Sequence, residues 1–122
     1  MNLNQEPNET NTIQAYTTNQ IQINSVSYEG SLIVSKENII TDVAIKSILE
    51  LDKQYLDLLL KEKPELILIG HEQTGKLPPM TFMEMLSKLH IGFECMSVGA
   101  AARTFNVLLS EHRNVVVGFI LE

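Results

Sequence analysis

The sequence predicts an α/β fold, a three-layer domain with a parallel central sheet, flanking helices and a smaller N-terminal antiparallel sheet. Apolar and polar residues alternate between residues 12 and 34, which is typical of half-buried antiparallel strands. Over residues 52–121, helical spacing alternates with short, continuous apolar runs, which are typical of strands covered on both faces. The order strand, helix, strand, helix, strand in this second half implies parallel strands joined by crossovers.

The N-terminal part of the chain divides into a tail and a strand region. Residues 1–11 are polar and rich in asparagine, so they cannot bury enough apolar surface to order themselves. We predict a flexible tail over residues 1–11 and a single α/β domain over residues 12–122. Residues 39–45 are a candidate for a further strand. The alternating apolar residues that predict the first strands are Ile13, Ala15, Ile21, Ile23, Val26, Tyr28, Leu32 and Val34.

The second half of the chain has helix start and stop signals between its strands. Asp52 is predicted to cap a helix that Pro64 ends, and residues 66–69 are predicted to form a strand. Thr81 and Glu84 have the spacing of a capping box, which predicts a helix beginning there. A strand over residues 91–96, a helix over 98–112 and a strand over 115–121 complete the pattern. The predicted apolar helix positions are Leu56, Leu59, Leu60, Phe82, Met85, Leu86 and Leu89.

Composition and charge exclude several functional classes. The formal net charge is -6 and no basic stripe appears, which argues against nucleic-acid binding. The single cysteine, Cys95, cannot form an intramolecular disulfide and fits a reducing compartment. No apolar run approaches the roughly 20 residues of a membrane span, and the N-terminus lacks the basic start and apolar centre of a signal peptide. We expect a cytoplasmic protein without membrane insertion.

Several of these segments carry a shared pattern. They resemble a family of small domains of unknown function found in bacteria and archaea, which includes the mitochondrial complex I (NADH dehydrogenase) assembly factor three. The family pattern has a strand ending in Gly-Thr-Gly, a loop with prolines, a strand ending in Glu-x-Met, a helix beginning Ala-Cys-Arg-Thr-Tyr-Asn, and a Glu-Gly-Arg turn. The matching residues are Leu66–Gly70, Pro78-Pro79, Glu94-Cys-Met96, Ala101-Ala-Arg-Thr-Phe-Asn106 and Glu111-His-Arg113.

The chain departs from the family pattern at specific positions. Gly-Thr-Gly is replaced by Gly70-His-Glu72, and the family cysteine, tyrosine and middle glycine are replaced by Ala102, Phe105 and His112. If the family cysteine performed chemistry, this protein would lack it. The resemblance covers about residues 12–122 and implies the same three-layer α/β fold.

Arg103 is the main candidate for a functional side chain. At 100° per residue, Arg103, Asn106, Ser110 and Arg113 lie on one stripe of the predicted helix. This stripe could be a solvated face. Arg103 could instead make a fork of hydrogen bonds to loop carbonyls or a carboxylate, or it could bind a ligand. We expect it to be ordered and hydrogen-bonded.

A small-anion site is predicted at the carboxyl ends of the parallel strands, where ligands of such sheets bind. The N-terminus of the helix after residue 97 offers free N–H groups and a positive partial charge. The alternative is that the small residues serve close packing of this helix on the sheet. The residues predicted to line the site are Gly70, His71, Ser97, Gly99 and Arg103.

Other chemistry has little support in the sequence. His71, His90 and His112 lack metal-ligand spacing, so we expect no metal. The full Gly-rich fingerprints of dinucleotide and P-loop sites are also missing, and we expect no cofactor. We expect His112 to be partly buried on the apolar face of the helix and Cys95 to be an inert, buried thiol. Two functions stay open. One is a non-enzymatic interaction domain that helps to assemble a larger complex, with a protein partner or a second copy. The other is an enzyme or sensor that binds a small anion near Gly70, Ser97 and Arg103.

Overall fold

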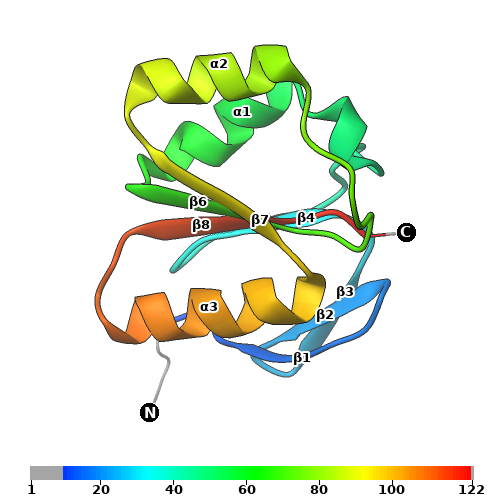
Figure 1. Ribbon diagram of the computed structural model, residues 1–122. Helices are drawn as coiled ribbons and strands as arrows, with labels where there is room; N and C mark the ends of the chain where they lie inside the picture. The colour runs from blue at the N-terminus through cyan, green and yellow to red at the C-terminus, as the bar shows by residue number, and fades with distance from the viewer. Residues whose placement is uncertain (1–9, 122) are drawn as a thin grey trace.

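The structure is a computed structural model that describes residues 10–121, so residues 1–9 of the predicted tail lie outside the described residues. The fold has three layers (Figure 1). Helices α1 (Lys53–Leu59) and α2 (Met80–Leu89) cover one face of a central sheet. Helix α3 (Val98–Ser110) and a small antiparallel sheet cover the other face. This confirms the predicted fold class.

The small sheet has the strand order β1-β2-β3, with β1 at Ile13–Tyr16, β2 at Gln20–Ile23 and β3 at Val26–Glu29. The central sheet has the order β5-β4-β8-β6-β7. Its strand β6 pairs in parallel with both β7 and β8, as predicted. The bounds of the central strands are β4 Leu32–Val34, β5 Ile39–Ile40, β6 Leu66–Gly70, β7 Gly92–Met96 and β8 Val115–Phe119.

Strand β4 is the main correction to the predicted topology. Residues 32–34 were expected in the N-terminal meander, but β4 pairs antiparallel with β8, with Leu32 opposite Phe119. The central sheet is therefore mixed. Alternation of apolar residues indicates that a segment is a strand but not which strand it pairs with. The candidate strand over residues 39–45 is also shorter than expected, because only Ile39–Ile40 pairs with β4.

The start of α2 was predicted wrongly. The helix begins at Met80 and its N-cap is Pro79, which makes no side-chain capping bond. The backbone carbonyl of Pro79 accepts from the N–H groups of Phe82 and Met83. Thr81 already lies inside the helix, so its hydroxyl is not at the capping position. A capping box with the same spacing does occur at Ser47 and Glu50, around the short 3-10 helix η1 (Ile48–Glu50). Asp52 caps α1 as predicted, because its carboxylate accepts from the N–H of Tyr55.

After α1, the chain passes through the 3-10 helix η2 (Leu60–Glu62) and reaches Pro64 after a left-handed residue, Lys63. The packed part of the chain includes Asn11, one residue before the predicted domain boundary. Asn11 is buried, its N–H donates to the carbonyl of Lys36, and its side-chain amide donates to the carbonyl of Ser35.

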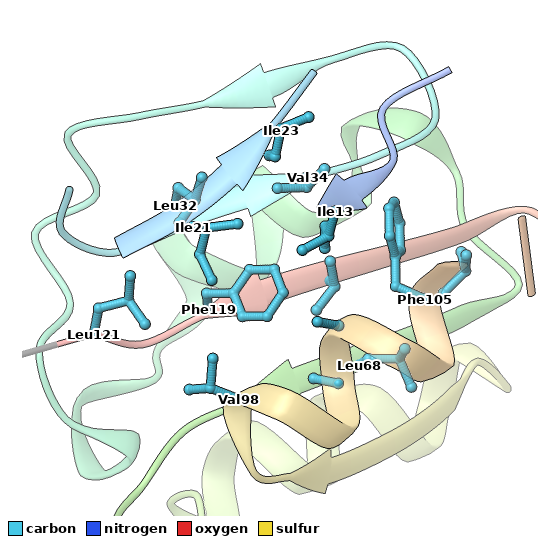
Figure 2. Close-up of a cluster of buried hydrophobic side chains, with 14 residues drawn as sticks. Ile13, Ile21, Ile23, Leu32, Val34, Leu68, Val98, Phe105, Phe119 and Leu121 are labelled. Carbon is cyan, nitrogen blue, oxygen red and sulfur yellow. The ribbon is translucent and has the colours of Figure 1, made fainter. Parts of the chain in front are cut away.

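Two apolar clusters hold the layers together. One lies between the central sheet, α3 and the small sheet, and its members include Phe119, Phe105 and Ile21 (Figure 2). The other lies between the central sheet and helices α1 and α2, around Phe82, Tyr55 and Ile69. Burying a side chain of this size contributes roughly 1.5–3 kcal/mol. The two-sided burial of β6 and β8 explains why their sequences are continuous apolar runs.

Candidate functional site

The loops that follow β6 and β7 meet at one edge of the sheet, as the parallel pairing requires. The N–H of His71 donates to the carbonyl of Met96 over 3.0 Å. A cavity of about 440 Å³ lies between these loops. His71 and Ser97 both line it, so the structure brings together two of the five predicted site residues. Its other lining residues are Glu72, Thr74, Gly75, Lys76, Leu77, Cys95 and Met96.

The N-terminus of α3 already has an anionic partner from the chain itself. The carboxylate of Glu72 accepts from the N–H of Val98 over 3.0 Å. The hydroxyl of Ser97 accepts from the N–H of Ala100 over 3.2 Å. These bonds satisfy two of the free N–H groups at the helix start and place a negative charge at its positive end. A second anion there would meet repulsion from Glu72.

Gly70 and Gly99 serve close packing. A Cβ placed on Gly70 would lie 2.8 Å from the Cβ of Ala101 and 3.0 Å from Cδ1 of Phe119. A Cβ placed on Gly99 would lie 3.0 Å from Cε1 of the Tyr16 ring. The first glycine lets α3 approach the sheet, and the second lets Tyr16 of β1 pack against the start of α3. Neither glycine is among the residues that line the cavity.

Arg103 lies away from the cavity and is attached to the small sheet. Its Nη1 donates to the hydroxyl of Tyr16 over 3.3 Å. The side chain is therefore hydrogen-bonded as expected, but to a hydroxyl on an exposed surface rather than to a loop carbonyl or a carboxylate. Asn106 makes a stronger connection to the same strand. Its Oδ1 accepts from the N–H of Ile13 over 3.0 Å, and its Nδ2 donates to the carbonyl of Ile13 over 2.9 Å.

His71 is held in one tautomer by its own loop. Its Nδ1 accepts from the N–H of Gln73 over 3.0 Å, which places the proton of the neutral ring on Nε2. Burial lowers the pKa of His71, and the nearby charge of Glu72 opposes that shift. The side chain is therefore a neutral hydrogen-bond donor at the mouth of the cavity at pH 7.

Cys95 differs from its expected environment, because its residue is exposed. Strand β7 lies at the end of the central sheet, so only one of its edges is paired. The strand predicted here is confirmed as Gly92–Met96, but its residues are half-buried or exposed rather than buried. Partial desolvation nevertheless raises the pKa of the Cys95 thiol to about 11. The residue is therefore exposed, but its thiol is partly desolvated and poorly ionised at neutral pH, which does not fit a nucleophile.

His112 was expected to be partly buried on the helix, but it is exposed. Helix α3 ends at Ser110, and His112 has a left-handed backbone with φ of 62°. The N–H of His112 donates to the carbonyl of Leu109, and that of Arg113 donates to the carbonyl of Leu108. This is the Schellman arrangement, in which glycine is the preferred residue. The middle glycine of the family turn fits this backbone.

Metal ligation and membrane crossing find no support in the part of the chain that the structure describes. No group of three or more His, Cys, Asp and Glu side chains within residues 10–121 could hold a metal ion. None of the helices in that range is long and apolar enough to cross a bilayer.

Three features of the structure were not predicted from the sequence. Leu77 and Met80 are highly exposed beside the cavity loop, and two prolines between them were the only local sign of an irregular segment. Tyr16 is the partner of Arg103, which no spacing in the sequence indicates. Tyr55 is fully buried, and its hydroxyl has no hydrogen-bond partner among the described residues.

Comparisons with known proteins agree with this fold. A family profile described as "Protein of unknown function (DUF498/DUF598)" matches residues 13–120. The chain is 32% identical over 101 residues to the "13 kDa major membrane protein" of Francisella tularensis subsp. holarctica (strain LVS), covering 82% of both proteins.

Two solved structures show the same arrangement. A solution structure of a Xanthomonas campestris protein superposes with a TM-score of 0.84 at 30% identity, covering 99% of this chain and 92% of the other. A crystal structure described as an outer membrane protein from Bartonella henselae has a TM-score of 0.78 at 27% identity, covering 92% and 95%. The chain therefore belongs to the DUF498/DUF598 family of proteins of unknown function, as the resemblance in its sequence predicted.

Proposed function

We propose that this chain is a non-enzymatic interaction domain that helps to assemble a larger complex, and that it binds a protein partner along the open edge of β7. The supporting observation is that this edge strand lies beside the exposed apolar side chain of Leu77. Leu77 and Met80 are 76% and 75% exposed, and Leu77 lines the same cavity as Cys95 of β7. Figure 1 shows β7 at the end of the sheet, and no strand within residues 10–121 pairs with its outer edge.

The register of β7 indicates which backbone groups are free. The N–H of Gly92 donates to Glu65, and the carbonyl of Met96 accepts from His71, so these residues face β6. In a parallel ladder, alternate residues face opposite edges, so the backbone groups of Phe93 and Cys95 face outward. Such an edge can add a strand from a partner, and a nearby apolar surface adds contact area. An edge of this kind in a monomer invites non-specific association unless it is covered.

The proposal can be tested by cross-linking from Cys95, the chain's one cysteine. The purified chain is labelled there with a photoreactive maleimide, over the long incubation that its poorly ionised thiol requires, and it should then cross-link a specific protein in an extract of native cells. Leu77→Asp should abolish the cross-link, because it places a charge in the apolar contact. Val26→Asp, which changes an exposed apolar residue of the small sheet, is the matched control and should leave it unchanged. Equal loss with both variants, or a cross-link only to a second copy, would contradict the hetero-complex.

The family resemblance makes NADH dehydrogenase the first complex to examine, by native gel electrophoresis of cells lacking the protein. We also propose a cytoplasmic location. Two relatives carry the word membrane in their names, and attachment through a partner would place this chain in membrane fractions as well. High-salt or carbonate washing should release it, whereas retention after washing would indicate a direct anchor.

A second candidate function is binding of a small anion at the cavity between the β6 and β7 loops. It is favoured by the meeting of His71 and Ser97 there, but Glu72 holds the helix N-terminus. Sulfate should then stabilise Glu72→Gln more than the parent chain, measured as melting temperature against chloride at equal ionic strength. Equal shifts in both salts for both proteins would remove this candidate.

A further inference from the structure

A second cavity lies at the opposite edge of the sheet, between α1 and the irregular segment that follows β5. Its volume is about 590 Å³, which is within the roughly 300–1,000 Å³ range of small-ligand sites. Ile40, Val43, Ile45 and Leu58 line it, and each is a half-buried residue that packs against the core cluster under α1 and α2. The floor of the cavity is therefore continuous with the core and apolar.

The rim of this cavity is acidic. Asp42, Glu50 and Asp52 line it, and its lining contains no Lys, Arg or His from the described part of the chain. The carboxylate of Glu50 accepts from the N–H groups of Lys46 and Ser47, and that of Asp52 accepts from the N–H of Tyr55, so both are fixed in place. Lys46 lines a neighbouring cavity together with Asp42. We call residues 40–45 with Glu50, Asp52 and Leu58 the acidic groove.

The backbone of the groove is also available for bonding. Residues 42–45 make no backbone hydrogen bond to any other described residue. Asp42 has a left-handed backbone with φ of 58°, which separates this segment from the regular pairing of β5. Exposed backbone groups beside an apolar floor are the features that extended peptides use when they bind.

We propose that the acidic groove binds a basic, amphipathic, extended segment of a partner protein. Its aliphatic side chains would cover the apolar floor, and its Lys or Arg side chains would face the three carboxylates. The charge of the groove favours a basic partner, because no basic side chain in its lining neutralises the three carboxylates. Opposite charges increase the rate at which two proteins associate and fix how the partner is aligned. This surface is at the other end of the sheet from β7, so the inference is independent of the interaction proposed above.

The test uses the full chain and two synthetic peptides, one of alternating leucine and lysine and one of alternating leucine and glutamate. Binding is measured by titration followed through backbone amide chemical shifts. The basic peptide should bind saturably, with shifts centred on residues 40–58, and the acidic peptide should not. Asp42→Asn should weaken binding about threefold, the effect of one partly screened charge pair. Asparagine tolerates a left-handed backbone, so this variant should keep the fold.

Two further variants decide the result. Ala44→Leu, which places a larger side chain in the groove, should also weaken binding. Glu84→Gln makes the same charge change on the exposed surface of α2 and should leave binding unchanged. The proposal is overturned if both peptides bind equally, if Asp42→Asn and Glu84→Gln have equal effects, or if the shifts centre on β7. Concentration-dependent shifts at residues 40–58 in the chain alone would show that a second copy fills the groove instead.

Discussion

The contact between Tyr55 and Gly118 allows the packing under α1 to be tested directly. Tyr55 is 2% exposed, and its hydroxyl lies against the backbone of Gly118 in β8, where a Cβ would overlap it. That hydroxyl has no hydrogen-bond partner within residues 10–121. Burial raises the pKa of Tyr55 far above its ordinary value, with a smaller contribution from Cys95. Gly118 therefore leaves space for the Tyr55 hydroxyl, and that hydroxyl makes no hydrogen bond there that would offset the cost of burying it.

The two single variants should have opposite effects on stability. A buried, unpaired hydroxyl costs roughly 1–3 kcal/mol, so Tyr55→Phe should be neutral or stabilising. Gly118→Ala should cost about 1–3 kcal/mol through overpacking. Without the hydroxyl, the nearest atoms to the new Cβ are Cδ1 of Ile69 and Cζ of residue 55, each at 3.2 Å, which small shifts can relieve. When Tyr55 is already phenylalanine, Gly118→Ala should therefore lower the free energy of unfolding much less. Alanine also loses less backbone entropy on folding than glycine, which stabilises the double variant by about 0.5–1 kcal/mol.

The assay is urea denaturation of the parent, both single variants and the double variant. The double variant should be more stable than the sum of the single effects by about 1–3 kcal/mol, a coupling typical of residues in contact. The slopes with urea should stay equal, so that the midpoints report stability. Additivity within about 0.5 kcal/mol would show that the hydroxyl does not occupy the space above Gly118. A clear loss of stability in Tyr55→Phe would show that the hydroxyl has a partner.

Three further predictions concern single residues. Cys95 should react slowly with iodoacetamide at pH 8 despite the exposure of the residue. Its thiol pKa is about 11 against an ordinary 9.0, so the thiolate fraction is roughly one-hundredth of that of an ordinary cysteine. A reaction rate equal to that of a small free thiol would contradict this prediction. The lowered pKa of His71 means that the unfolded chain binds more protons, so the urea midpoint should fall as the pH decreases through 6.5, and His71→Gln should flatten that dependence. His112→Gly should raise the free energy of unfolding by about 1 kcal/mol, because it relieves a left-handed residue; an unchanged or lower midpoint would show that the imidazole makes a compensating contact.

The parallel part of the fold could be predicted because burial on both faces leaves a local signature. Residues 66–69 and 115–117 are continuous apolar runs, and both strands are covered by helices on each side. The position of a strand within the sheet leaves no such signature. Residues 92–96 contain a glycine and a glutamate but otherwise resemble a covered strand, and only the strand order shows that β7 is at an edge. The exposure of Cys95 follows from that order.

The candidate site was predicted in part for a similar reason. The parallel direction of the strands correctly predicted that His71 and Ser97 lie together, because the carboxyl ends of parallel strands share one edge of the sheet. A helical wheel gives the face on which Arg103 and Asn106 lie, but it does not give the element that covers that face. In the structure, Tyr16 and Ile13 of β1 lie there. The carboxylate of Glu72 could not be assigned to Val98, because loop conformation decides where it points.

These contacts also give a physical account of the segment that most resembles the family pattern. Within residues 101–106, Phe105 lies in the core, Asn106 bonds to the backbone of Ile13, and Arg103 donates to the hydroxyl of Tyr16. The segment therefore attaches the small sheet to α3, and none of these three side chains lines the cavity at the strand ends. Holding the small sheet against α3 does not require the cysteine of the family pattern. Ala102, which stands at that position and packs in the same core cluster, is therefore compatible with the family fold. In this chain, the residues that match the family pattern in this segment therefore contribute contacts that hold the layers of the fold together.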